Sequence, residues 1–126
     1  MRAEQQALIE RYIQAYNQFD VAGMVENLHP EILFENIAED KVTLSLQGVP
    51  AFRKQAEAAL AFFSSRQQQI TNWHFDKEKI RIDISYQAIL AIDLPNGMKA
   101  GESLQLNGRS IFHFKKDKII RIIDIS

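Results

Sequence analysis

The stretch Ile80-Arg81-Ile82-Asp83-Ile84-Ser85-Tyr86-Gln87 decides the fold of this chain. Its apolar and polar side chains alternate strictly, and a period of two residues is typical of a β-strand with one buried face. One face carries isoleucine and tyrosine, whereas the other carries charges of both signs. The sequence therefore predicts a long amphipathic strand that forms one side of a hydrophobic core.

The residues after this strand keep the same period. Pro95-Asn96-Gly97 predicts a turn, and residues 101–115 return as a second long strand. Lys115-Lys116-Asp117-Lys118 then predicts a tight turn into a last strand over residues 119–125. Because the alternation continues through Gly108, we interpret this glycine as a β-bulge that curves the sheet.

The first third of the chain has a helical period instead. Apolar residues within 3–17 recur at steps of three and four, which predicts an amphipathic helix. Asp20 is placed to cap a short second helix, which we expect Pro30 to stop.

Two short strands and one more helix complete the pattern. Strands are predicted near residues 31–37 and 42–47, and Gly48-Val49-Pro50 opens a third helix that Ser64-Ser65 closes. Helices first and strands afterwards indicate the α+β class. We expect one domain over residues 1–126, in which a cone-shaped, curved antiparallel sheet wraps around the N-terminal helices.

Composition excludes several classes of function. The 126 residues include no cysteine, which excludes a disulfide framework, a thiolate zinc site and a cysteine nucleophile. A formal net charge of −1 gives no electrostatic basis for binding nucleic acid or an anionic membrane. No two histidines have metal-ligand spacing, so we expect neither a metal nor another cofactor.

The distribution of apolar residues argues against membranes and secretion. The longest apolar runs, such as residues 58–63, are far too short for a membrane span. Met1 leads into a polar stretch over residues 2–6 where a secretory signal would be apolar. We therefore expect a cytoplasmic protein.

The order of these elements resembles the cone-shaped α+β barrel of the nuclear transport factor 2-like superfamily, a cystatin-like roll. That superfamily includes ketosteroid isomerases, SnoaL-like polyketide cyclases, scytalone dehydratase and limonene-epoxide hydrolase. The resemblance covers essentially the whole chain. The stretches that carry it are residues 11–20, 23–25, 28–31, 48, 108–114 and 118–120. Such varied chemistry on one fold means that the fold implies a pocket but not a reaction.

Only part of the steroid isomerase machinery is present. The resemblance implies that Tyr12 matches the isomerase tyrosine, that Asn36 stands at the position of the carboxylate base and that Ser110 replaces the oxyanion acid. An amide cannot shuttle a proton at neutral pH, and a serine hydroxyl is a weaker donor than a neutral acid. The sequence therefore argues against classical steroid isomerase activity.

The same resemblance implies which residues of the last two strands face into the cone. Ser110 and Phe112 are matched to inward positions, together with Ile120, Ile122, Asp124 and Ser126. A carboxylate among apolar residues should have a raised pKa, as a general acid or base needs, and no inward Lys or Arg is expected to oppose this rise. We expect Asp124 to be the catalytic acid or base, with a hydrated strand end as the alternative.

Further pocket candidates are aromatic. Tyr12 and Tyr16 lie one turn apart on the buried helix stripe, so either hydroxyl could enter the pocket or be a satisfied core group. Trp73 and His74 lie on opposite faces of a strand, and the sequence leaves open which faces inward. An inward His74 would allow a pair with Asp124, as in a dehydratase or cyclase.

Two classes of function follow from these residues. The first is a pocket enzyme that transfers protons on a small apolar or aromatic molecule. Its predicted catalytic groups are Asp124 and Tyr12, and its predicted ligand-binding residues are Tyr16, Asn36, Trp73, Ser110, Phe112 and Ile122. The alternative is a non-catalytic ligand-binding or association domain. We also predict a homodimer through the convex sheet face, where isoleucines 111, 119, 123 and 125 alternate with charges.

Overall fold

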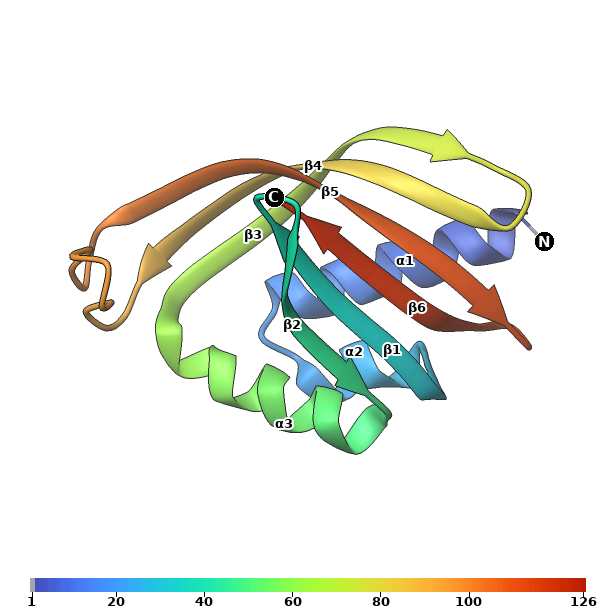
Figure 1. Cartoon of the computed structure of the whole chain (residues 1–126), viewed down its shortest axis with the longest axis horizontal. Coiled ribbons are helices and arrows are strands. Elements are labelled where there is room, and N and C mark those ends of the chain that lie inside the picture. Colours follow the sequence, from blue (N-terminus) through green and yellow to red (C-terminus); the bar gives the residue numbers. More distant parts are fainter. Residues whose placement is uncertain (1) are drawn as a thin grey trace.

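The computed structural model describes residues 2–126. The chain forms a curved sheet with helix α1 (Arg2–Asn17) along its inner side (Figure 1). The elements after α1 are α2 (Val21–Glu26), β1 (Leu28–Ala38), β2 (Lys41–Gln47), α3 (Val49–Ala59), a 3-10 turn (Leu60–Phe62), β3 (Phe63–Phe75), β4 (Lys79–Leu90), β5 (Ser103–Lys115) and β6 (Lys118–Ile125). The predicted α+β class, with a curved sheet around N-terminal helices, is confirmed.

The six strands lie in the order β2-β1-β6-β5-β4-β3. Neighbouring strands are antiparallel except for β1 and β6, which run parallel. The expectation of a wholly antiparallel sheet is therefore wrong at this one pair. The chain returns from β5 through a tight turn, and β6 then inserts between β5 and β1 in the direction of β1. Asn36 consequently lies beside Asp124 in the register.

The core lies between the concave face of the sheet and the helices. In β4, Ile80 and Ile82 are fully buried and Ile84 nearly so, as the alternating pattern predicts. Phe112 of β5 and Ile122 of β6 are fully buried beside them. Burial of this apolar surface is the main term that stabilises the fold.

Two predicted local signals are confirmed. The Asp20 carboxylate accepts a hydrogen bond of 2.9 Å from the backbone N–H of Gly23 and so caps α2. Lys116 and Asp117 have φ values of 51° and 63°, the left-handed pair that joins β5 to β6 in a tight hairpin.

Several element ends differ from expectation. Helix α2 ends at Glu26, and Pro30 lies inside β1. Strand β3 begins at Phe63, so Ser64-Ser65 belongs to the strand and does not end the helix. Pro30 and Ser64-Ser65 were thus wrongly predicted to end helices. At Ser64-Ser65 the reason is that pairing with β4 extends β3 back to Phe63, further than its local pattern indicates.

Irregularities in the sheet also fall at other places than predicted. The β4–β5 register runs through Gly108 without a shift, so Gly108 is not a β-bulge. The β5–β6 register instead shifts between His113 and Phe114. That shift places Ile119 on the buried face, fully shielded from solvent, where the unshifted pattern indicates Ile120.

None of the helices within residues 2–126 is long and apolar enough to cross a lipid bilayer. Met1, at the start of the polar N-terminal stretch, lies outside the described residues. The cytoplasmic location stays a prediction.

Candidate functional site

The carboxyl group of Asp124 lies on the concave side of β6 and is mostly shielded from water. The Ser110 hydroxyl on the neighbouring strand β5 donates a hydrogen bond of 2.6 Å to Oδ1 of Asp124. Burial raises the pKa of Asp124 to about 6, although the Ser110 hydrogen bond opposes the rise. This carboxyl can therefore exchange a proton close to neutral pH.

Two phenol hydroxyls form a second polar group on the concave side. Tyr16 near the end of α1 and Tyr86 of β4 are hydrogen bonded through their oxygens at 2.9 Å. Burial raises the pKa of both tyrosines, so both hydroxyls stay protonated and can donate at neutral pH. The side chain of Asn17 makes two hydrogen bonds with the backbone of Gln68, of 3.0 and 2.7 Å, and thereby holds this end of α1 against β3.

One cavity of about 160 Å³ connects the carboxyl group with the phenol pair. The polar residues in its wall come from α1, β1, β3, β4, β5 and the end of β6, and they are Tyr16, Asn36, Gln68, Tyr86, Asn107, Arg109, Ser110, Asp124 and Ser126. Gly108 lies in the same wall and has no side chain to fill the space. A cavity of this size accommodates about one aromatic ring.

A buried cation lies behind the phenol pair. Arg66 of β3 is 6% exposed, and its Nε donates a hydrogen bond of 2.9 Å to the backbone carbonyl of Tyr16. Its guanidinium carbon lies 3.7 Å from the centre of the Tyr16 ring. The expectation that no basic residue faces inward is therefore wrong for Arg66, whereas no Lys or Arg is among the groups that shift the pKa of Asp124, as expected.

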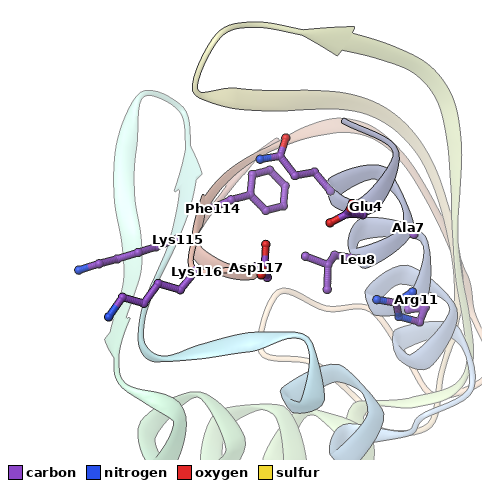
Figure 2. Close-up of a pocket in the computed structure, with 9 residues that line it drawn as sticks. Glu4, Ala7, Leu8, Arg11, Phe114, Lys115, Lys116 and Asp117 are labelled. Carbon is purple, nitrogen blue, oxygen red and sulfur yellow. The ribbon is translucent and has the colours of Figure 1, made fainter. Parts of the chain in front are cut away.

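A larger hollow of about 480 Å³ lies elsewhere, between α1 and the β5–β6 turn. Leu8 and Phe114 contribute apolar surface to it, and the charged groups along it are exposed. Figure 2 shows the Lys115 and Lys116 side chains extending away from this hollow. The larger hollow brings together no buried pair of polar side chains, so we place the functional site at the smaller cavity.

The family model of the SnoaL-like domain matches residues 9–122 of this chain. The chain belongs to the SnoaL-like domain family. No curated protein matches its sequence significantly.

Solved structures show the same fold at low sequence identity. A proposed polyketide cyclase from Xanthomonas campestris pv. campestris has a TM-score of 0.84 and 15% identity, covering 99% of this chain and 91% of that one. The proposed hydroxylase AclR from Streptomyces galilaeus has a TM-score of 0.76 and 19% identity, covering 97% and 87%. TerC, crystallised with polyporic acid, has a TM-score of 0.77 and 10% identity, covering 97% and 90%. A cystatin fold protein from Novosphingobium aromaticivorans and an NTF2-like protein from Burkholderia pseudomallei also match, with TM-scores of 0.73 and 0.77 at 19% and 11% identity, so the fold is nuclear transport factor 2-like or cystatin-like.

The SnoaL-like cavity brings together four of the residues predicted from the sequence, which are Tyr16, Asn36, Ser110 and Asp124. The Asn36 amide donates to the Thr43 hydroxyl of β2 at 2.8 Å, so part of its hydrogen-bonding capacity is already used. An amide in this role cannot replace the isomerase base.

Three other predicted residues lie deeper in the SnoaL-like core. Tyr12 packs against Phe52 and Phe112, with ring centres 6.4 and 6.1 Å away. Tyr12 is buried, and Phe112 and Ile122 are fully so; none of the three is in the cavity wall. Burial raises the pKa of Tyr12 well above its ordinary value, and the negative charge of Asp124 contributes, so the two groups are electrostatically coupled.

The orientation of Trp73 and His74 is now settled. Trp73 faces the concave side opposite Ile82 and stacks on Phe75, away from the cavity wall. His74 points outward, and its Nε2 lies 3.1 Å from the Asp83 carboxylate, whose pKa it lowers. The hypothesis of a pair between His74 and Asp124 is therefore wrong, because the strand alternation directs these two side chains to opposite faces.

Sequence reasoning missed two residues of this site. Tyr86 could have been found, because it shares the alternating face of Ile82 and Ile84 and is the one polar-tipped residue of that series. Arg66 gives no such signal, since its strand begins among polar residues without a clear period. Among residues 2–126, no group of three His, Asp or Glu side chains is placed to hold a metal ion.

Proposed function

We propose that this SnoaL-like domain binds a small, mainly aromatic molecule with a carbonyl or hydroxyl group and transfers a proton on it with Asp124. The observation that carries the proposal is the single cavity that joins the Asp124 carboxyl to the Tyr16–Tyr86 hydroxyl pair. A carboxyl with a pKa of about 6 is suited to take up and return a proton at neutral pH.

The chemistry requires one proton acceptor and one hydrogen-bond donor. The Asp124 carboxylate would remove a proton from a carbon beside a carbonyl, and the electrons left behind would move onto the carbonyl oxygen. A hydroxyl of the tyrosine pair would donate a hydrogen bond to that oxygen. Return of the proton to another carbon gives an isomerase. If the enolate carbon instead forms a bond to a second carbonyl carbon of the ligand, whose oxygen takes the proton, the reaction is a cyclisation; if the C–O bond of a neighbouring hydroxyl breaks and that hydroxyl takes the proton, water leaves and the reaction is a dehydration. The classical steroid isomerase reaction is not proposed, because Asn36 stands at its base position.

Structural relatives support an aromatic ligand. The proposed polyketide cyclase and TerC with its polyporic acid share this fold, and polyketides and polyporic acid carry carbonyl and hydroxyl groups on carbon frameworks. Most residues of the wall are polar, and Ile84, Leu106 and Ile125 add apolar surface to it, which fits a ligand that has both polar groups and a carbon framework.

The alternative is ligand binding without catalysis. Phe52, Phe112 and Tyr12 are buried and packed together in the core, so this part of the concave side holds no space for a ligand. A cavity of about 160 Å³ is smaller than most substrate pockets. This observation favours a small ligand that is held partly exposed.

An exchange experiment separates the two candidates. Phenylacetone carries an aromatic ring and an acidic C–H beside a carbonyl, and NMR in D₂O follows the replacement of that hydrogen by deuterium. We expect the wild-type protein to accelerate exchange and Asp124→Asn to abolish the acceleration, while the matched control Asp117→Asn in the distant β5–β6 turn retains it. Binding that perturbs the Gly108 and Ile125 amide signals without exchange would instead establish the binding role.

We also propose that the convex sheet face forms a homodimer. Ile111, Ile123 and Ile125 are only partly exposed there, next to Arg121, which forms an ion pair of 2.6 Å with Glu35. Ile119 is not part of this face, because the β5–β6 register shift turns it inward. Homodimer interfaces are more apolar than the rest of a protein surface, and the partly exposed isoleucines of this face fit that composition.

A further inference from the structure

We propose that Arg66 makes this cavity selective for ligands whose oxygen carries negative charge, such as a phenolate or an enolate. In this proposal the Tyr16 hydroxyl contacts the charged oxygen, and Arg66 is a positioning residue behind Tyr16. The inference rests on the proposed function, because it concerns the ligand of the same cavity.

The charge of Arg66 has no carboxylate partner. Within residues 2–126, no Asp or Glu oxygen lies within 4.0 Å of its guanidinium, and its buried Nη2 makes no hydrogen bond. Its contacts are the Tyr16 carbonyl and the rings of Tyr16 and Phe19, with the ring centres 3.7 and 4.6 Å from the guanidinium carbon. A buried charge is costly unless opposite charge compensates it, so the site favours the arrival of negative charge nearby.

Tyr16 connects this cation to the cavity. The guanidinium lies over one face of the Tyr16 ring, while the hydroxyl of the same ring reaches the cavity wall. A cation over the ring withdraws electron density and makes the phenol O–H a better hydrogen-bond donor. In agreement with this, the positive charge of Arg66 opposes the rise in the pKa of Tyr16 and of Tyr86.

The hydroxyl pair leaves a proton for the ligand. Tyr16 and Tyr86 share one hydrogen bond of 2.9 Å, in which one hydroxyl donates and the other accepts. The accepting hydroxyl keeps its own proton, which can point into the cavity. A ligand oxygen there would accept a hydrogen bond from this hydroxyl, and the hydroxyl pair would connect it to the Tyr16 ring on which the Arg66 cation lies.

The charge balance is consistent with Asp124 as the base. When the Asp124 carboxylate takes the proton of a bound phenol, the ligand O–H bond breaks and a carboxyl O–H bond forms. The total charge of the cavity is unchanged, and the negative charge moves from Asp124 to the ligand oxygen near Tyr16. Arg66 stabilises the state after transfer more than the state before it, because the charge has come closer to the cation.

Two probes of the same shape test this inference. 4-Nitrophenol can ionise, and its phenolate absorbs visible light, whereas 4-nitroanisole stays neutral. At a pH where free 4-nitrophenol is mostly protonated, we expect the wild-type protein to hold it as phenolate and to bind it more tightly than 4-nitroanisole. The absorption of the bound probe in the wild-type protein gives this answer without any variant.

Variants then assign the preference to Arg66. We expect Arg66→Met to weaken 4-nitrophenol binding by about tenfold and to remove the phenolate band, with little change for 4-nitroanisole. Arg66→Lys should retain most of the preference, Tyr16→Phe should lose it with Arg66 in place, and the exposed control Arg53→Met should match wild type.

The outcomes separate this inference from the proposed function. If both probes bind equally and the bound 4-nitrophenol stays protonated, the selectivity is disproved while the cavity remains a ligand site. If neither probe binds, the inference and the proposed ligand site both fail. If Arg66→Met does not fold, the wild-type spectrum and the variants Arg66→Lys and Tyr16→Phe decide whether the cavity selects the phenolate.

Discussion

The Ser110 hydroxyl donates a hydrogen bond of 2.6 Å to the Asp124 carboxylate across the β5–β6 pair. Burial raises the pKa of Asp124, and this hydrogen bond opposes the rise. Burial therefore sets the high proton affinity of the proposed acid–base group, and one neighbouring side chain reduces it.

Replacement of Ser110 should show this dependence. Ser110→Ala removes a donor to the charged form, so we expect the pKa of Asp124 to rise above its present value of about 6. A hydrogen bond to a charged group, worth about 1.5–3 kcal/mol, corresponds to a pKa rise of about 1 to 2. An NMR titration of the Asp124 carboxyl measures it, with the exposed Ser103→Ala as control; an unchanged or lower pKa would contradict the assigned role of Ser110.

Asp124→Asn should change the pH dependence of stability. A raised folded-state pKa means that the protonated carboxyl stabilises the fold fully below the ordinary aspartate value of 3.8, and that this contribution is lost as the pH rises through about 6. The asparagine variant has no such loss, so its free energy of unfolding should exceed that of wild type by about 1–3 kcal/mol near pH 8 and by little near pH 4. Urea unfolding at both pH values provides the test, and a variant less stable than wild type at the higher pH would refute the raised pKa.

Tyr12→Phe should leave the fold intact. Within residues 2–126 the Tyr12 hydroxyl has no hydrogen-bond partner, so its removal should cost less than about 1 kcal/mol. The ring matters more, because it packs between Phe52 and Phe112, and Tyr12→Ala should cost about 3–5 kcal/mol. Urea midpoints compare the two variants; equal losses would mean that the hydroxyl is an essential structural donor.

The homodimer prediction concerns the convex face. We expect sedimentation at micromolar concentration to give twice the chain mass of 14.5 kDa. Ile123→Glu would introduce unpaired charge at the interface and should produce monomers, whereas Val42→Glu, at a residue 54% exposed on edge strand β2, should not. A wild-type monomer would refute the prediction.

The sequence predicted the elements whose signals are local. The alternation from Ile80 to Tyr86 defines β4 and its buried face, and the Asp20 cap marks the start of α2. Both depend on side chains within a few residues of one another along the chain. The inward position of Asp124 was predicted from the family resemblance. The resemblance indicates which strands are neighbours, and the residues around Asp124 alone do not.

The remaining features depend on contacts between distant segments. The parallel pairing of Asn36 with Asp124 has no local signature, because either strand could pair in both directions. Register shifts along β3 and between β5 and β6 turn Trp73 and Ile119 to faces that a continuous alternation does not define. The position of Arg66 also depends on a distant segment, because Tyr16 of α1 supplies both the carbonyl and the ring that Arg66 contacts.

Gly108 links the width of the cavity to the position of the acid. A Cβ atom at this residue would lie 3.0 Å from the carbonyl oxygen of Ile125, the residue that follows Asp124. Any side chain there would narrow the cavity and also push the end of β6. A change of cavity width at residue 108 would therefore also move the strand end that carries Asp124, whereas Ile84 and Leu106 line the cavity on other strands and can change its width without moving that end.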